Sequence, residues 1–480
     1  MIYDNLGESK DHHKMRICFL YTPDQELNKG HYSEKMAENF SKSAQILPPL
    51  GMAYLAALLR QKGFTVGFLD ANALGLTEEQ ILNKLHEFKP DCLLYTTITD
   101  NFQYTLGWIK NIKQKLDVPA IVGGPHMSLY PKETLTHHCI DYGVVGDGWE
   151  TLPELLQTIQ AGGDLSTVKS IVYRKDGEIM ATEYRSQSVS LEDVPFPARD
   201  IMPLNHYDTV LTKSRPIGII ITALGCPFRC TYCVTDTNLR SRSAEHVVAE
   251  IEECVNKYGI KEITFYDETF TVNRKRVTEI LDLLEEKKLK FSWIVRTRAD
   301  CVDKEMIERM ARLGCIEIRI GIESGDEKVL RSINRFIPLE RIRNVVKWSK
   351  QAGLVVFGFF MVGLPGETKE EIMKTLKFML ELDLDFVEIN KFVPLPGSQI
   401  YENMKRDTGQ DFWRDYTLGK VSPEQLKPYQ RGLSEEELNR LLEKSYRRFY
   451  YRPRYVWKRL VAVKSWKEFK KLVSAAWSLR

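Results

Sequence analysis

The sequence predicts an α/β protein built from two series of strand-helix units, one in each half of the chain. From Met15 to about Gln160, short apolar or β-branched runs such as MRICFLY and FTVGFLD alternate with amphipathic stretches. Five such units predict a parallel sheet covered on both faces, a doubly wound Rossmann-like domain. A second series, from IGIIITAL to FVEINKFVPL, contains six strands and five intervening helices. It predicts a partial (β/α)6 TIM-type barrel with its chemistry at the carboxyl ends of the strands.

The places where this alternation breaks set the expected domain boundaries. A turn at Arg174–Glu178 between two β-rich runs predicts a hairpin, and the Pro-rich passage Val194–Pro197 predicts a connector. We therefore expect the first domain at 15–160, a hairpin and linker at 161–211, the barrel at 212–400 and a helical C-terminal extension at 401–480.

Composition indicates a folded globular protein. The 480 residues are 43% hydrophobic and 28% charged, which fits two or three domains. The 68 Lys plus Arg nearly balance 65 Asp plus Glu, so net charge alone argues against strong nucleic-acid binding. The N-terminus has no basic start followed by an apolar run, and no stretch of 18 apolar residues occurs, so we expect a cytoplasmic protein. The nine cysteines are therefore expected to be reduced thiols or metal ligands.

Three of these cysteines form a motif in the loop after the first predicted barrel strand. Cys226, Cys230 and Cys233 have CxxxCxxC spacing within GCPFRCTYC. A 4Fe-4S cube normally takes four thiolates, so three would leave one iron open to a substrate or cofactor. Buried cysteines or a zinc site are the alternatives, but structural zinc usually needs four protein ligands and no fourth Cys or paired His lies nearby in sequence. No cysteine follows Cys315, so we expect one cluster.

The motifs of the second half resemble those of the radical S-adenosylmethionine (SAM) superfamily, and the first half resembles the cobalamin-binding domain of its class B branch. The resemblance covers roughly residues 15 to 460. Besides the cysteines, it rests on Thr222–Cys226, Phe265–Phe270, Thr297–Asp300, Ile320–Gly325, Phe360–Thr368 and Pro394–Gly397, each at the end of a predicted strand.

The resemblance implies roles for several residues near the cluster. Cys226, Cys230 and Cys233 would hold the cluster, whose open iron would bind SAM, and one electron would cleave SAM to a deoxyadenosyl radical. Tyr232 would lie beside the adenine. The remaining SAM contacts would be Asp267 or Glu268 to the ammonium, Glu323 and Ser324 to the ribose or methionine portion, and Arg298 to the carboxylate. The alternative is that these acids are solvated strand ends and that Arg298 forms a structural salt bridge.

The first half contains class B cobalamin signatures but lacks one common element. No GxGxxG follows the first strand, which disfavours a dinucleotide. The DxHxxG element that supplies a cobalt-ligating His in other cobalamin domains is missing, so we expect cobalamin without a protein His on cobalt. His126 follows Gly-Gly-Pro and is more typical of a turn residue than of a ligand. The residues expected at the corrinoid are Pro49, Gly51, Thr96, Thr97, Gly123, Gly124, Pro125, His126, Gly146, Gly148 and Glu150.

The C-terminal segment 446–480 is basic and aromatic. It holds eleven Lys or Arg against one acid, Glu468, together with Trp457, Trp466 and Trp477. Such a segment suits an amphipathic helix on an anionic membrane surface, at the inner face of the membrane. It would also suit a basic cover packed on the barrel, or contact with RNA phosphates.

Together these features lead to a hypothesis for the function. The resemblance implies a cobalamin-dependent radical SAM enzyme of the kind represented by hopanoid methylases and the anaerobic magnesium-protoporphyrin ester cyclase. Such an enzyme would abstract hydrogen from a large apolar small-molecule or lipid substrate, and we expect methyl transfer to follow. Oxidative cyclisation or carbon-carbon coupling is the alternative second step. An RNA-modifying enzyme or a non-catalytic iron-sulfur sensor is less expected, and nucleic acid is not an expected partner. The electron donor would be of flavodoxin or ferredoxin type.

Overall fold

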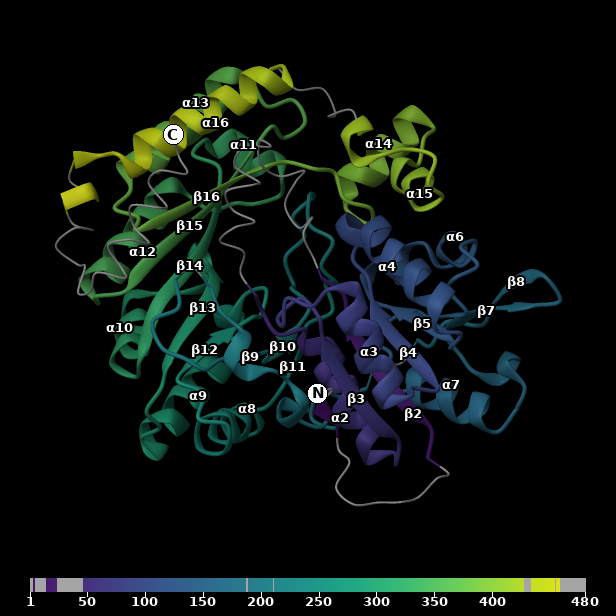
Figure 1. Ribbon diagram of the computed structural model, residues 1–480. Coiled ribbons are helices and arrows are strands. Elements are labelled where there is room, and N and C mark those ends of the chain that lie inside the picture. The colour runs from purple at the N-terminus through teal and green to yellow at the C-terminus, as the bar shows by residue number, and fades with distance from the viewer. Residues whose placement is uncertain are drawn as a thin grey trace.

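The computed structural model describes residues 3–4, 14–23, 46–186, 189–209, 211–426, 433–453 and 455–457. Figure 1 shows two α/β halves side by side, the first in purple and blue and the second in teal and green. The division at the middle of the chain is the one that the two strand-helix series predict. No helix among the described residues is long and apolar enough to cross a membrane.

The first half contains a parallel five-stranded sheet in the order β3-β2-β4-β5-β6. The strands are β2 (Arg16–Tyr21), β3 (Thr65–Asp70), β4 (Cys92–Thr96), β5 (Ala120–Gly123) and β6 (Tyr142–Val144). The helices are α2 (Leu50–Gln61), α3 (Glu78–Phe88), α4 (Phe102–Lys115), α5 (Pro125–Leu129), α6 (Pro131–Leu135) and α7 (Thr151–Gln160). Separate apolar clusters pack on the two faces of the sheet, one with α3 and α4 and the other with α2 and α7. The strand order reverses between β2 and β4, and ligands of such sheets bind at that point, beyond the carboxyl ends of the strands.

The predicted hairpin is β7 (Ile171–Lys175) and β8 (Glu178–Ala181). We expected it to belong to the linker. Instead β7 pairs antiparallel with β6, so the hairpin extends the first sheet. A two-residue strand, β1 (Tyr3–Asp4), pairs antiparallel with β3 at the other edge. The first domain is therefore larger than the sequence periodicity indicated, because an antiparallel addition to a sheet leaves no strand-helix signature.

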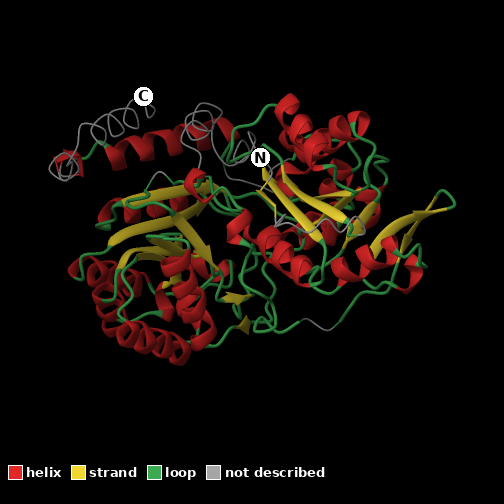
Figure 2. Cartoon of the chain, turned by 60° about the horizontal axis from the view of Figure 1, so that its bottom comes forward, coloured by secondary structure: helices red, strands yellow, loops and turns green. Residues whose placement is uncertain are grey.

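The second half is the predicted open barrel of six parallel strands in chain order. They are β9 (Ile217–Ile220), β12 (Glu262–Phe265), β13 (Ser292–Arg298), β14 (Cys315–Glu323), β15 (Val355–Val362) and β16 (Phe386–Lys391). Figure 2 shows these strands with helices packed against them. The helices are α8 (Ala244–Glu252), α9 (Arg274–Lys287), α10 (Lys304–Arg312), α11 (Glu327–Ser332), α12 (Leu339–Gln351) and α13 (Lys369–Glu381).

Short turns complete the described secondary structure. A π-helical turn, Glu253–Lys257, continues α8. The 3-10 turns are Thr99–Asn101, Leu165–Thr167, Arg199–Ile201, Leu204–His206, Phe270–Val272, Ala299–Cys301 and Pro423–Gln425.

A buried ionic network joins the two halves through the linker. Glu250 of α8 is fully buried and forms ion pairs with Arg199, at 2.5 Å, and with Arg242. Although burial raises its pKa, the two guanidinium groups hold the pKa of Glu250 below its usual range. The hydroxyl of Tyr54, from α2 of the first half, lies 3.5 Å from the same carboxylate. The network therefore sets the position of α2 relative to the barrel.

After β16 the chain returns to the first half. Helices α14 (Gln399–Thr408) and α15 (Phe412–Thr417) lie above α4 in Figure 1. The carboxylate of Asp411 accepts hydrogen bonds from Tyr130, at 2.9 Å, and from Tyr401, at 2.7 Å. The amide of Gln103 donates to the Tyr416 carbonyl at 2.6 Å. These contacts bind the C-terminal helices to α4 and α5, so the extension bridges both halves.

The last described helix, α16 (Glu435–Tyr450), covers the open edge of the barrel at β16. The hydroxyl of Tyr446 accepts from the Ile389 backbone N–H at 2.7 Å. The hydroxyl of Tyr450 accepts from the Val387 N–H at 3.2 Å and donates to the Val387 carbonyl at 3.1 Å. An edge strand presents backbone N–H and C=O groups that no neighbouring strand pairs, and the two tyrosine hydroxyls form hydrogen bonds with some of them.

This packing bears on the expectation that the segment 446–480 lies on a membrane, but only for the residues up to Trp457. Its described residues, which end at Trp457, belong mainly to the barrel cover that was the second alternative. Trp457 is itself exposed. Trp466 and Trp477 lie outside the described residues. Aromatic residues among basic ones suit both roles, and Tyr446, Phe449 and Tyr450 take the packing role beside the barrel.

Candidate functional site

The cysteine loop connects two short paired strands, β10 (Ala223–Leu224) and β11 (Arg240–Ser241), at the carboxyl end of β9. Gly225 has φ of +85°, and a Cβ atom there would lie 2.3 Å from the Asn238 carbonyl oxygen. Only glycine fits at this point. The Cys226 backbone N–H then donates to the Asp236 carbonyl at 2.8 Å, which closes the loop on itself.

Three contacts from other elements hold the loop in place. The Thr231 N–H donates to the Ile333 carbonyl at 3.2 Å, and the Asn334 side chain donates to the Arg229 carbonyl at 2.7 Å. The Ile400 N–H donates to the Thr231 carbonyl at 3.0 Å. The end of α11 and the start of α14 therefore position a loop that has little regular structure of its own.

The three thiols of the loop are free and partly exposed, and each has a polar group beside its sulfur. Arg298 Nη1 lies 3.5 Å from Cys230 Sγ, and Thr235 N–H donates to Cys233 Sγ at 3.5 Å. The Thr269 hydroxyl is 3.9 Å from Cys226 Sγ. Burial raises the pKa of the Cys233 thiol, and metal binding overcomes such a penalty because a coordinating thiol is deprotonated.

This set of donors fits an iron-sulfur cluster better than a single metal ion. Thiolates on one tetrahedral zinc ion lie about 4 Å apart, given Zn–S bonds of about 2.3 Å. Within the part of the chain that the structure describes, no three His, Cys, Asp or Glu residues converge closely enough to hold one ion. Three separated soft ligands on one loop suit the larger cube, with one iron left for another ligand.

Two of the predicted SAM contacts, Tyr232 and Glu323, lie together beside the cluster loop. Glu323, at the end of β14, has φ of +65°, an uncommon conformation for a residue other than glycine. Burial raises the pKa of its carboxyl group, while Arg335, whose Nη2 is 3.9 Å away, and a hydrogen bond from Tyr232 lower it. Arg335 also lies 3.9 Å from Cys230 Sγ. The sequence analysis did not single out this arginine.

Arg298, another predicted SAM contact, has partners within the protein. Its guanidinium group stacks on Phe228, 3.7 Å from the ring centroid, and forms a two-point ion pair with Asp300 at 2.8 and 3.0 Å. The salt bridge that we considered as the alternative is therefore present. Because Arg298 also contacts Cys230, its contact with SAM remains a prediction.

Asp267 and Glu268 are adjacent in sequence but face different surroundings. The carboxylate of Asp267 is buried and accepts from the Thr222 N–H at 2.6 Å and the Ala223 N–H at 3.3 Å. Asp267 also forms an ion pair with Arg276 at 3.6 Å. These contacts tie the end of β12 to the segment that leads into the cluster loop. Glu268 is exposed, yet surrounding protein raises the pKa of its carboxyl group, as expected for a residue at a concave surface. Of the two, Glu268 is the one open to a ligand.

Ser324 is also turned inward. It is fully buried, and its hydroxyl lies 2.9 Å from that of Thr375 and accepts from the Asp326 N–H at 3.1 Å. The structure therefore places Ser324 and Asp267 in supporting positions, and it brings Tyr232, Glu268, Arg298 and Glu323 around the cysteine loop.

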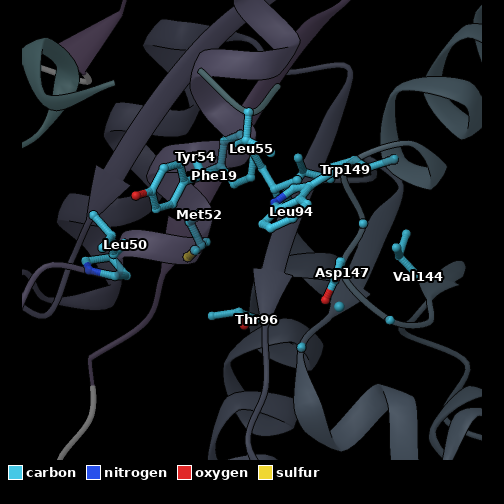
Figure 3. Close-up of a pocket in the computed structure, with 18 of the residues that line it drawn as sticks. Phe19, Leu50, Met52, Tyr54, Leu55, Leu94, Thr96, Val144, Asp147 and Trp149 are labelled. Carbon is cyan, nitrogen blue, oxygen red and sulfur yellow. The ribbon is translucent and has the colours of Figure 1, made fainter. Parts of the chain in front are cut away.

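The predicted corrinoid site coincides with a cavity of about 400 Å³ at the carboxyl ends of β2, β4, β5 and β6. Figure 3 shows Phe19, Leu94 and Trp149 among its apolar lining, with Asp147 as a polar group. Eight of the residues expected at cobalamin line it: Pro49, Gly51, Thr96, Gly123, Gly124, Pro125, Gly146 and Gly148. Its lining is mostly backbone, glycine and apolar side chains, which suits a large flat ligand that must approach the chain closely.

Three expected residues do not line this cavity: Thr97, His126 and Glu150. His126 is fully buried, stacks on Phe102 with ring centroids 4.0 Å apart, and burial lowers its pKa to about 3. A packed core position therefore accounts for this histidine. Among the described residues that line the cavity none is a histidine, and the absence of a protein His on cobalt remains a prediction.

Sequence reasoning missed several residues of the cavity. Phe19 and Leu94 are ordinary apolar strand residues, and only their place near strand carboxyl ends would have indicated them. Ile221 and Leu224 come from the second half and complete the wall. The cavity thus borders the segment that leads directly into Cys226.

Comparison with known proteins defines the class. Residues 220–379 match the radical SAM superfamily, and residues 39–156 match the B12 binding domain. The chain is 32% identical over 421 residues to an uncharacterized methyltransferase of Pyrococcus horikoshii, covering 85% of this chain and 88% of that protein. The chain therefore belongs to the radical SAM superfamily and carries a B12-binding domain. It is a radical SAM enzyme, and its cofactors are a 4Fe-4S cluster, SAM and cobalamin.

Further relatives agree with this assignment. The anaerobic magnesium-protoporphyrin IX monomethyl ester cyclase of Cereibacter sphaeroides is 27% identical over 420 residues, 84% of this chain and 67% of that enzyme. The cobalamin-dependent SAM radical enzyme OxsB superposes with a TM-score of 0.70 at 17% identity, covering 97% of this chain and 72% of that one. The radical SAM methyltransferase TsrM from Kitasatospora setae gives a TM-score of 0.63 at 19% identity, with 81% and 76% covered. These two structures show the shared fold.

Proposed function

We propose that the chain catalyses radical C-methylation of a large, mainly apolar substrate. The observation that carries the proposal is the contact between the two predicted cofactor sites. Leu224 lines the cavity predicted to hold the corrinoid, and Cys226, the first predicted cluster ligand, follows two residues later. Radical formation and methyl donation could therefore act on one substrate carbon in the same space.

The roles of the residues follow from their positions. When bound, SAM and the cluster supply a carbon radical that removes hydrogen, and cobalamin supplies the methyl group. Cys226, Cys230 and Cys233 would hold the cluster, and Arg298 beside Cys230 would stabilise the negative charge of its thiolate. Glu323 would accept hydrogen bonds from SAM.

An ion pair at the rim of the cavity connects the two halves of the chain. Asp147 of the first half forms an ion pair with Arg240 of β11 at 2.7 Å. Arg240 also lies 5.7 Å from the ring centroid of Trp149. We propose that this link holds the corrinoid site against the cluster loop.

The second candidate is oxidative cyclisation or coupling without methyl transfer. It is supported by the similarity to the magnesium-protoporphyrin ester cyclase. A second protein, an electron donor of flavodoxin or ferredoxin type, would be needed in either case.

Anaerobic product analysis separates the candidates. The protein, reconstituted with iron, sulfide and hydroxocobalamin, would be incubated with SAM and titanium citrate. We expect both S-adenosylhomocysteine and deoxyadenosine, with S-adenosylhomocysteine formed only when cobalamin is present. Deoxyadenosine alone would support the second candidate. Formation of neither product, in a protein that holds its cluster, would refute the proposed function.

A further inference from the structure

The inner, concave face of the barrel sheet is partly open and carries an ordered set of side chains. Along β15 and β16, partly exposed residues alternate with buried ones that pack against the helices. Since side chains alternate across a strand, the open set belongs to the concave face. The strand register places Arg296, Arg319, Phe357 and Phe386 in one row across β13, β14, β15 and β16.

Arg296 differs from the other arginines of this face. Its guanidinium group lies 4.1 Å from the ring centroid of Tyr266, which fixes the plane of the group. Its Nε atom is buried and has no hydrogen-bond partner. Among the described residues, no carboxylate lies within the 4.0 Å that defines an ion pair with it. Glu268 influences it only electrostatically, from a greater distance.

The neighbouring arginines each have a protein oxygen as partner, although the Nε atom of Arg335, like that of Arg296, has none. Arg319 forms an ion pair with Glu317 at 2.6 Å, and Arg298 pairs with Asp300 at 2.8 Å. Arg335 donates to the Gly321 carbonyl. A buried donor without a partner lowers stability, so a guanidinium group that also lacks a carboxylate partner is expected where a ligand supplies the missing acceptor.

The position of Arg296 suits a substrate contact. It precedes Arg298 by two residues on β13 and faces the same side of the sheet, so their Cα atoms are about 7 Å apart. Arg298 contacts Cys230. Arg296 therefore lies one layer of side chains below the cluster site, close enough to anchor a molecule whose reacting carbon is next to SAM.

Aromatic side chains occupy the other side of the same row. The ring centroid of Phe357 lies 4.8 Å from that of Phe359 and 6.1 Å from that of Phe386. All three are partly exposed on the concave face. The face thus offers an apolar aromatic surface at β15 and β16 and an unpaired, planar cation at β13.

From this arrangement we propose that Arg296 binds an anionic oxygen group of the substrate, a carboxylate or a phosphate, while the apolar body lies against Phe357, Phe359 and Phe386. A guanidinium group matches both anions with paired N–H donors. The inference rests on the proposed function and deepens it: the substrate is amphiphilic, with one anionic end.

The experiment compares three small probes on the anaerobically reconstituted full chain with SAM present. The probes are 4-phenylbutyrate, phenyl phosphate and the neutral 4-phenylbutan-1-ol, and binding is titrated by saturation-transfer NMR. We expect at least one anionic probe to bind about tenfold or more tightly than the alcohol. The preferred anion distinguishes a carboxylate substrate from a phosphate substrate.

Variants assign the effect to one residue. Arg296→Gln should remove the preference for the anion, and Arg296→Lys should retain part of it because the charge remains. The control is Arg406→Gln, at an exposed position on α14, which should leave the preference unchanged. Iron content and the thermal midpoint establish that each variant is folded.

Two outcomes would overturn the inference: equal binding of anionic and neutral probes to the wild-type protein, or an anion preference that survives in folded Arg296→Gln. Cleavage of SAM is measured in the same samples. If SAM is cleaved and the anion preference is absent, the inference about Arg296 fails and the proposed function stands. If SAM is not cleaved, the proposed function itself fails.

Discussion

The predicted cluster site and the predicted corrinoid cavity adjoin each other, but they are formed by different kinds of residue. The cluster site uses reactive side chains, three thiols with Arg298 and Arg335 close to one sulfur. The cavity uses glycines, backbone and apolar residues, with Asp147 as its one carboxylate among the described lining. A small inorganic group needs specific ligand atoms, whereas a large planar cofactor needs shape and close approach. The two sites should therefore fail in different ways when they are mutated.

The largest effect is expected at the thiols. Replacing Cys226, Cys230 and Cys233 together by Ala should reduce bound iron from about four atoms per chain to near zero and abolish SAM cleavage, because the cluster loses its protein ligands. Iron analysis and visible absorption measure this. Cys139→Ala, at a partly exposed position in the first half, is the control. A cluster that persists in the triple variant, or close to eight irons in the wild type, would contradict the assignment.

Cobalamin binding in the cavity should be weakened by a larger side chain in the lining, whereas the cluster is lost when its ligand atoms are removed. Gly51 lines the cavity, and a Cβ atom there would meet nothing within 4 Å. Gly51→Leu should therefore fold normally but lower cobalamin affinity at least tenfold, because the side chain fills space the ligand needs. Gly107→Leu, at a helical glycine outside the lining with equally open surroundings, is the matched control. Equal cobalamin uptake by the two variants in an equilibrium binding titration would argue against this location.

The stability of the protein should depend on pH, because the barrel contains a buried acid, Glu367, just beyond the end of β15. Burial raises the pKa of Glu367 to about 7 from 4.5, although backbone N–H groups of Gly363 and Leu364 donate to its carboxyl group. Between these values the unfolded chain loses a proton that the folded chain keeps. The free energy of unfolding should fall as pH rises from about 4.5 to 7, by about 3 kcal/mol in total.

Thermal unfolding of Glu367→Gln tests this sign. The variant should gain stability relative to the wild type as pH rises from 5 to 7, because glutamine has no proton to retain. The exposed neighbour Glu370→Gln should follow the wild-type profile. Parallel profiles for wild type and Glu367→Gln would contradict the raised pKa.

The smallest expected effects on stability come from substitutions at the edge of the barrel sheet, because the two halves protect their sheet edges differently. The first half ends in a backbone-paired hairpin, whereas β16 of the barrel is closed in part by tyrosine hydroxyls. Tyr446→Phe and Tyr450→Phe should each lower the free energy of unfolding by about 1–2 kcal/mol, because each hydroxyl bonds both the N–H and the carbonyl of one β16 residue. Denaturant titration measures this, with the exposed Tyr184→Phe as control. No loss in either variant would show that water replaces the hydroxyls.

Comparison of neighbouring residues shows where prediction from sequence stopped. Motif position alone could not separate Asp267, whose buried carboxylate accepts from the Thr222 N–H, from Glu268, which is exposed near the cysteine loop. The same holds for Ser324, whose hydroxyl meets Thr375 from a helix 51 residues away. Adjacent residues at a strand end point in different directions, and which of them meets the ligand depends on elements distant in sequence.

The sequence by itself determined the parts that depend on local spacing. The three-cysteine loop, the alternation of strands and helices and the glycine-rich strand ends follow from residues close together in the chain, where period and spacing translate directly into geometry. Only the tertiary structure decided the rest: that Ile221 and Leu224 close the corrinoid cavity, that His126 is a core residue, that α16 covers the edge of β16, and that Arg296 has no described ion-pair partner. These features depend on how segments far apart in sequence pack together. Residue type and local spacing do not show which distant side chains will meet.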